Sequence, residues 1–148
     1  MPPNKGFEMA AGMTHEAIYD FMRARKLAVI SSIGPRGEPQ SALVGFAVSP
    51  DLEIVFDTLS SSRKYRNLKR DSSIAIVFGW EGETTIQYEG RASEPLGDEL
   101  HRAKDIYFAT WPDGRERETW PGIAYFLVRP KWLRYSDFDT NRIEELWF

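Results

Sequence analysis

Short strand-like runs separated by tight turns are the feature that most constrains the fold of this 148-residue chain. Residues 27–33 are rich in apolar and β-branched side chains and end at the sequence GPRG, residues 34–37, a strong turn signal. A second run, residues 39–48, ends at the turn 49–51, and a third follows at 52–57. Connections this short join antiparallel strands, so we expect an antiparallel sheet.

The rest of the chain continues this pattern, with helical segments between the strands. Further strands are predicted at residues 73–80, 84–93, 123–128 and 132–137, and the tail 142–148 is either a short amphipathic strand or an interface segment. Helices are predicted at residues 14–26 and 96–110, and a short basic helix follows residue 62. A sheet of six or more twisted strands in a small domain tends to close. We therefore expect a mainly β protein, an antiparallel barrel of about six to eight strands with two or three peripheral helices.

Composition limits the protein to one domain and excludes several kinds of site. The length suits one ordinary domain, which we place at residues 14–148 after a flexible N-terminal leader, 1–13, without the features of a secretory signal. The chain has no cysteine, which excludes disulfides, thiolate metal sites and a cysteine nucleophile. Its two histidines, His15 and His101, are far apart in sequence, so we expect no metal site.

Charge and hydropathy also bear on partners. The net charge of −3 argues against a nucleic-acid binder, whose footprint is usually basic. No apolar run approaches the ~20 residues that cross a bilayer. The absence of cysteine is compatible with a reducing compartment. We therefore expect a cytoplasmic protein with no nucleic-acid or membrane partner.

The segment FDTLSSSRKYRNL, residues 56–68, carries the clearest functional signal. A strand there runs into a hydroxyl-rich turn whose serines are good N-cap residues for the basic helix that follows. The free N–H groups of a helix start, together with Arg63 and Lys64, would suit a phosphate. An ordinary surface helix, with Tyr65 and Leu68 packed on the core, fits the same pattern, and the local sequence leaves both interpretations open.

The ordered set of segments resembles the pyridoxamine 5′-phosphate oxidase-like family, the FMN-binding split barrels. The resemblance covers roughly residues 14–138 and rests on the segments 41–44, 56–68, 74–78, 87–92 and 130–134. It implies a split β-barrel that forms a homodimer, with FMN at the interface and a small-molecule substrate. The expected reaction is hydride transfer to or from the flavin, and the resemblance assigns no catalytic residue.

The resemblance also implies which residues contact the cofactor. Ser62, Arg63 and Lys64 would hold its phosphate, and Asp57 and Thr58 would face it from the preceding strand end. The flavin ring would lie along the strand that carries Ala42, Leu43 and Val44. The remaining implied contacts come from later strands and in part from the partner subunit: Thr85 or Gln87, Trp132 and Arg134.

This chain departs from the pyridoxamine phosphate oxidases themselves. They carry a basic residue in the second strand where this chain has Gln40-Ser41-Ala42, and their C-terminal substrate motif is not visible. The chain looks more like the short members of the family, some of which use the 8-hydroxy-5-deazaflavin coenzyme and some haem. A haem binder would need His15 or His101 as axial ligand.

Tryptophans mark three other segments. The segment 111–120, bounded by two tryptophans, is either a lid over a substrate pocket or a surface loop packed locally or at the dimer interface. Trp80 ends a strand and is expected in the core. The aromatic tail 146–148 is expected to be buried on the partner subunit.

Overall fold

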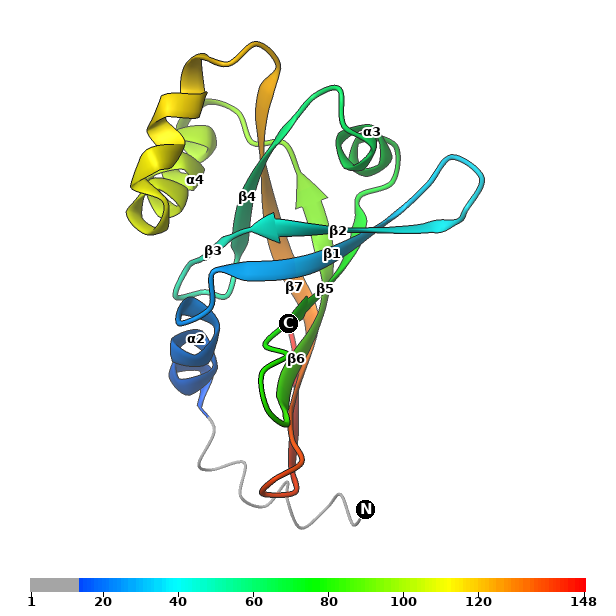
Figure 1. The fold of residues 1–148 in the computed structure, drawn as a ribbon, viewed down its shortest axis with the longest axis vertical. Coiled ribbons are helices and arrows are strands. Elements are labelled where there is room, and N and C mark those ends of the chain that lie inside the picture. The colour runs from blue at the N-terminus through cyan, green and yellow to red at the C-terminus, as the bar shows by residue number, and fades with distance from the viewer. Residues whose placement is uncertain (1–13) are drawn as a thin grey trace.

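The computed structural model describes residues 14–148, so the predicted leader 1–13 lies outside the described residues. Within these described residues, three α-helices and one 3-10 helix accompany eight strands, and Figure 1 shows their arrangement. The helices are α2 (His15–Arg23), α3 (Arg63–Arg70), α4 (Gly97–Thr110) and the 3-10 helix η2 (Pro112–Thr119). The strands are β1 (Leu27–Ile33), β2 (Pro39–Gly45), β3 (Ala47–Val48), β4 (Ile54–Leu59), β5 (Ser73–Phe78), β6 (Thr84–Ser93), β7 (Ile123–Asp137) and β8 (Arg142–Trp147).

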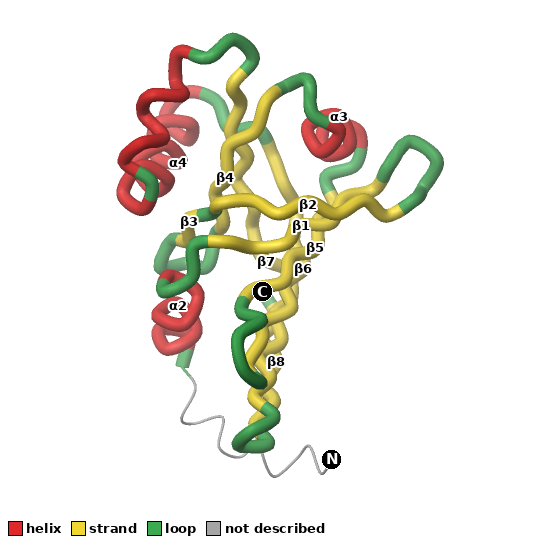
Figure 2. The backbone as a smooth tube through the Cα atoms, viewed as in Figure 1, coloured by secondary structure: helices red, strands yellow, loops and turns green. Residues whose placement is uncertain are grey.

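All eight strands belong to one antiparallel sheet with the order β2-β1-β5-β6-β7-β4-β3, and β8 pairs with β7 outside this path. The sheet curls so that β1 and β2 cross in front of β4 and β7 (Figure 2). The expected split β-barrel with peripheral helices is therefore confirmed. None of the helices within residues 14–148 is long and apolar enough to cross a membrane.

Two apolar clusters hold the barrel and its helices together. The larger one fills the barrel with aromatic side chains such as Phe46, Phe56, Phe78 and Phe126, each at most 1% exposed. The smaller one lies between α4 and the sheet, where Tyr107, Phe108 and Tyr125 meet edge to face. Burial of aromatic rings at this density is the main stabilising term in a domain of this size.

The second and third strands differ from their predicted bounds for local reasons. The run 39–48 is interrupted at Phe46, which separates β2 from β3, although its backbone N–H still bonds to Lys26 O at 3.1 Å, the next pair of the β1–β2 register. The third strand begins at Ile54 and not at residue 52, because Leu52 has φ of 63° inside the turn between β3 and β4. Side chains with that backbone angle are uncommon and mark turns, not strands.

The last strands are longer and more continuous than predicted. The runs 123–128 and 132–137 form one strand, β7, because Pro130 lies at a β-bulge opposite Gly90 of β6, and the chain continues through it. The tail adopts the first of its two predicted forms, a strand that pairs with β7 from Trp132↔Trp147 to Asp137↔Arg142.

Two further expectations were wrong. The segment predicted as loop after residue 110 holds the 3-10 helix η2. Trp80 is 51% exposed and not part of the core, since β5 ends at Phe78 and Gly79 adopts a φ of 71° that turns the chain outward. The helix predicted at 14–26 is capped by Thr14, whose Oγ1 accepts from Ala17 N at 3.0 Å, and it ends earlier than predicted, at Arg23.

Candidate functional site

The start of α3 is built by two hydroxyl side chains at the end of β4. Ser62 is the N-cap, and its Oγ accepts a hydrogen bond from Tyr65 N at 3.2 Å. The same Oγ lies 2.9 Å from Oγ1 of Thr58, a buried residue near the end of β4. Of the three serines that could cap the helix, the structure therefore uses the last one, and this choice sets Arg63 and Lys64 in the first helical turn.

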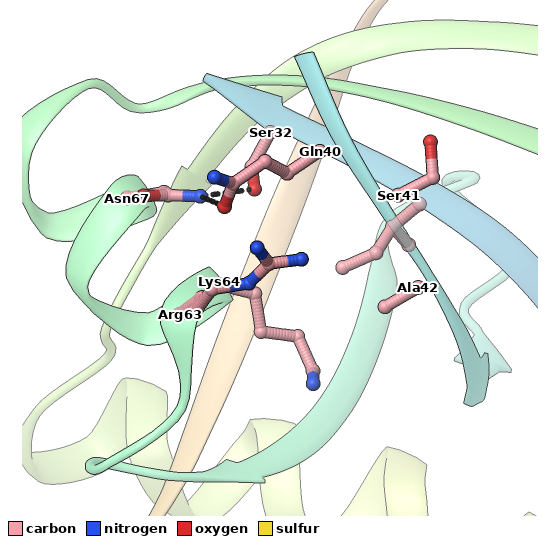
Figure 3. A pocket seen from close by; sticks show the side chains of 8 residues that line it. Ser32, Gln40, Ser41, Ala42, Arg63, Lys64 and Asn67 are labelled. Atoms are coloured by element: carbon pink, nitrogen blue, oxygen red, sulfur yellow. Dashed lines mark hydrogen bonds between the residues drawn. The ribbon is translucent and has the colours of Figure 1, made fainter. Parts of the chain in front are cut away.

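A cavity of about 120 Å³ lies beside this turn, between α3 and the inner face of β1 and β2. Arg63 and Lys64 extend into the space in front of β2, where Ala42 lies (Figure 3). The back of the cavity is polar, because Asn67 Nδ2 donates to Ser32 Oγ at 3.0 Å and to Gln40 Oε1 at 2.9 Å. Those three residues were not predicted. Residues 63 and 67 are one helical turn apart, and 40 and 42 share a strand face, so simple periodicity could have indicated Asn67 and Gln40.

The two cations of the cavity have no anionic partner within residues 14–148: neither Arg63 nor Lys64 makes an ion pair or a side-chain hydrogen bond there. Lys64 is half-buried, and this burial lowers the pKa of its ammonium group, while the charge of Asp57 acts in the opposite direction. A partly desolvated ammonium without a counter-ion is unfavourable unless a ligand supplies one. The cavity is therefore suited to a small anion.

Asp57 is engaged elsewhere in the fold. Its two carboxylate oxygens accept from Tyr107 Oη at 3.1 Å and from Arg117 Nε at 2.9 Å. These bonds join the end of β4 to α4 and η2, and Asp57 is not among the residues that line the cavity. Nearby, burial raises the pKa of Tyr125 to about 12, and its buried hydroxyl has no hydrogen-bond partner within the described residues.

The segment 111–120 is anchored at both ends. Trp111 Nε1 donates to Phe46 O at 2.9 Å, and its ring stacks on Tyr107 under the Lys26 ammonium. Arg117 adds the ion pair with Asp57, while Trp120 is 50% exposed. These contacts favour the second of the two predicted roles, a locally packed surface segment.

Most of the other predicted contact residues lie on the outer face of the sheet and not at the cavity. Leu43 of β2 is paired with Val29 of β1, and Val29 is paired on its other side with Val77 of β5. Val77 is paired with Gln87 of β6, and Gln87 with Arg134 of β7. These five side chains form a row across five strands, which we call the outer row. Leu43 is 59% exposed and Val77 40%.

The remaining predicted residues flank this row. Thr85 lies on the same face of β6, and Trp132 lies beside Arg134 on β7, its Nε1 donating to Glu145 Oε1 at 2.8 Å. Val44 points into the barrel and is 8% exposed, so it belongs to the core. The structure thus separates most of the predicted contacts into a phosphate-sized cavity and an outer face.

The histidines and carboxylates of the described residues form no second centre. His15 is exposed on α2 against the ring of Phe148, and His101 is exposed on α4. No group of three His, Asp or Glu side chains within residues 14–148 is placed to hold a metal ion.

Comparison with known proteins identifies the family of this chain. The sequence model of the family described as "Pyridoxamine 5'-phosphate oxidase" matches residues 14–137. The pyridoxine/pyridoxamine 5′-phosphate oxidase of Rubrobacter xylanophilus is 30% identical over 93 residues, which are 62% of this chain and 41% of that protein. The corresponding enzyme of Burkholderia ambifaria is 32% identical over 92 residues, again 41% of its length. The chain therefore spans less than half the length of these relatives.

Solved structures show the same fold at low sequence identity. A haem binding protein from Mycobacterium smegmatis has a TM-score of 0.78 and 15% identity, over 90% of this chain and 58% of that one. The General Stress Protein 26 from Bacillus anthracis has a TM-score of 0.71 and 19% identity, over 92% and 99% of the two chains.

Proposed function

Because this chain belongs to the pyridoxamine 5′-phosphate oxidase family, we propose that it is an FMN-binding oxidoreductase whose cofactor phosphate lies at Ser62, Arg63 and Lys64. The observation that carries the proposal is the pair of cations at the start of α3, which have no counter-ion within residues 14–148 and border a cavity of about 120 Å³. A phosphate there would neutralise both, with Arg63 donating to two oxygens and Lys64 supplying a point charge.

The residues present fit a phosphate better than they fit a neutral group. The first turn of α3 offers free backbone N–H groups, and Thr58 fixes the Ser62 hydroxyl that caps it. A cavity of about 120 Å³ admits a phosphate and its nearest carbons but not a three-ring flavin. The ring must therefore lie outside it, next to Ala42 and the edge of β2.

We propose that a second copy of the chain covers the ring. The outer row is apolar at one end, with Leu43, Val29 and Val77, and polar at the other, with Gln87 and Arg134. An apolar sheet face of this kind is a common interface between subunits. In such a homodimer Gln87, Trp132 and Arg134 of the partner subunit would approach the ring that one subunit's cavity holds by its phosphate.

The flavin would supply hydride transfer, and the chain would bind and orient it. The substrate is a small molecule that this site does not identify. The match to the pyridoxine/pyridoxamine 5′-phosphate oxidases covers only 41% of their length, so we do not assign pyridoxamine phosphate oxidation to this chain. The 8-hydroxy-5-deazaflavin coenzyme is a second candidate, because the same cavity would hold its phosphate.

Haem is less well supported than flavin. The haem binding protein from Mycobacterium smegmatis shares only the fold with this chain at 15% identity. A haem would need an axial ligand, and neither His15 nor His101 is among the residues that line the cavity.

The test is the double variant Arg63→Ala/Lys64→Ala. Removal of two charge-assisted contacts, each worth about 1.5–3 kcal/mol, predicts a loss of flavin affinity of more than about a hundredfold in a chain that remains folded. Flavin content is measured by the visible spectrum of the purified protein and by mass analysis of the released cofactor.

The matched control is Arg23→Ala/Lys69→Ala, which removes the same charge from two exposed side chains that do not line the cavity. It should keep its flavin. Normal flavin occupancy in Arg63→Ala/Lys64→Ala would refute the phosphate site, and a wild-type protein without flavin that also fails to take up added FMN would refute FMN binding. A Soret band would indicate haem instead.

A further inference from the structure

A groove lined by four arginines adjoins the phosphate cavity on the side of the β1–β2 hairpin. It has a volume of about 310 Å³ and lies between α3 and the hairpin, which projects past α3 in Figure 1. We call it the arginine groove, and its cations are Arg36, Arg63, Arg66 and Arg70. Glu38 is the one carboxylate among the described residues that line it.

Main-chain carbonyls hold two of these arginines in place without neutralising them. Arg70 Nη2 donates to Ile33 O at 3.2 Å and to Asn67 Oδ1 at 3.0 Å, which ties α3 to the end of β1. Arg66 Nη1 donates to Ser61 O at 2.7 Å. Each guanidinium keeps further N–H donors for a ligand.

The carboxylate of the groove does not balance its cations. Glu38 Oε1 accepts from Arg36 N at 2.7 Å, and the nearest guanidinium nitrogen, Arg36 Nη1, is 3.9 Å from Oε2. Arg66 and Arg70 are four residues apart on one helix, a spacing at which like charges repel. The chain as a whole has a net charge of −3, so this concentration of positive charge is local and unfavourable without an anion.

The groove and the phosphate cavity are adjacent. Gln40, Arg63 and Asn67 line both of them. A group bound at Arg63 in the cavity is therefore next to the space that Arg66 and Arg70 border.

We propose that the arginine groove binds a second phosphate of the ligand whose first phosphate lies at Arg63 and Lys64. This inference deepens the proposed function and depends on it for the identity of the ligand, a flavin nucleotide with more than one phosphate. FAD is the simplest probe, because it differs from FMN by a second phosphate and an adenosine.

The experiment is a competition on the full chain. The purified protein is equilibrated with equal concentrations of FMN and FAD, and the retained flavins are released by denaturation and quantified by chromatography. We expect about tenfold more FAD than FMN on the wild-type protein at low salt, because the second phosphate gains charge-assisted hydrogen bonds. The preference should weaken as salt screens the exposed arginines.

Arg66→Gln should reduce this preference to about twofold or less while FMN binding persists. Lys69→Gln is the matched control: it removes one charge from the same helix at a residue that pairs with Glu94 at 3.0 Å, and it should leave the preference unchanged. A wild-type protein that retains FAD and FMN equally, with no effect of Arg66→Gln, would refute a dinucleotide flavin.

A second probe separates this inference from flavin binding itself. The shift in Tm caused by tripolyphosphate is compared with that caused by inorganic phosphate at constant ionic strength. A larger shift with tripolyphosphate that Arg66→Gln abolishes supports the second phosphate site even if no flavin binds, and would then assign it to a polyphosphate of another nucleotide. Equal shifts for both anions, together with no preference for FAD, would overturn the inference.

Discussion

At the scale of single residues, the protonation of Lys64 gives a direct test of the phosphate site. Burial lowers the pKa of its ammonium group below the ordinary 10.5, and Asp57 limits the shift. A bound phosphate favours the charged form, so it raises this pKa, and by linkage phosphate affinity falls as pH rises through the pKa of the free protein.

We therefore expect the affinity for inorganic phosphate to fall by about tenfold as pH rises through the lowered pKa of Lys64, in a range above pH of about 8, where phosphate is already the dianion. Inorganic phosphate is the better probe because the flavin ring itself ionises in alkaline solution. Isothermal titration calorimetry measures the affinity at each pH.

Lys64→Arg supplies the control for this pH profile. A guanidinium stays charged above pH 12, so the variant should bind phosphate with little change over the same range. A variant that loses affinity as steeply as the wild-type protein would show that another group titrates.

The residues of the candidate site were predictable to the extent that their signal is local. The serine cap and the cations of residues 62–64 follow one another in the chain, and capping preference with charge is sufficient to indicate them. The partner of Asp57 could not be predicted, because Arg117 is 60 positions away and reaches Asp57 only through the packing of α4. Arg66 and Arg70 both belong to the basic helix α3, but the hairpin residue Arg36 that completes the groove comes from a different element.

At the scale of elements, strand bounds were predicted correctly where local sequence signals mark them and wrongly where they do not. The bounds of β1 and β6 agree with prediction, because turn residues and alternation mark both ends. The start of β4 was misplaced because Leu52 is apolar but occupies a turn, its side chain filling the core at 0% exposure. Pro130 was expected to divide two strands, and the bulge opposite Gly90 accommodates it within one.

The 3-10 helix η2 is mostly exposed and highly charged, so its position depends on contacts with other elements. Asp57 fixes it through Arg117, and the two side chains are only 15% and 23% exposed. Asp57→Asn should lower the free energy of unfolding by about 2 kcal/mol, less than for a fully buried pair because the partners retain some contact with water. Urea denaturation of the flavin-free protein measures this loss of free energy of unfolding. Trypsin should also cleave within η2 sooner in the variant than in the wild-type protein.

Asp113→Asn is the comparison for this change. Asp113 contacts the same Arg117 at 3.5 Å but is 60% exposed, so its loss should cost about 0.5 kcal/mol or less. Equal effects of the two variants would mean that Asp57 does not anchor the element.

At the scale of the whole molecule, aromatic side chains at the C-terminal end of the chain are exposed in the single chain. Trp147 is 77% exposed and Phe148 52%, although a tail buried on a partner was expected. Trp147 lies at the edge of the sheet face that carries the outer row, since it is opposite Trp132, whereas the ring of Phe148 packs against His15 of α2. That expectation stays a prediction, and it belongs with the proposed homodimer.

Val77→Lys tests the homodimer at the middle of the outer row. A charge between Val29 and Gln87 would have to be desolvated in the interface, so the variant should be monomeric by light scattering and should lose flavin as well. Leu96→Lys provides the control, because Leu96 is 78% exposed before α4 and outside the outer row. Thermal unfolding followed by circular dichroism shows that both variants are folded. If the wild-type protein is a monomer that binds flavin, or if Val77→Lys keeps both its dimer and its flavin, the ring does not lie against a second copy of this face.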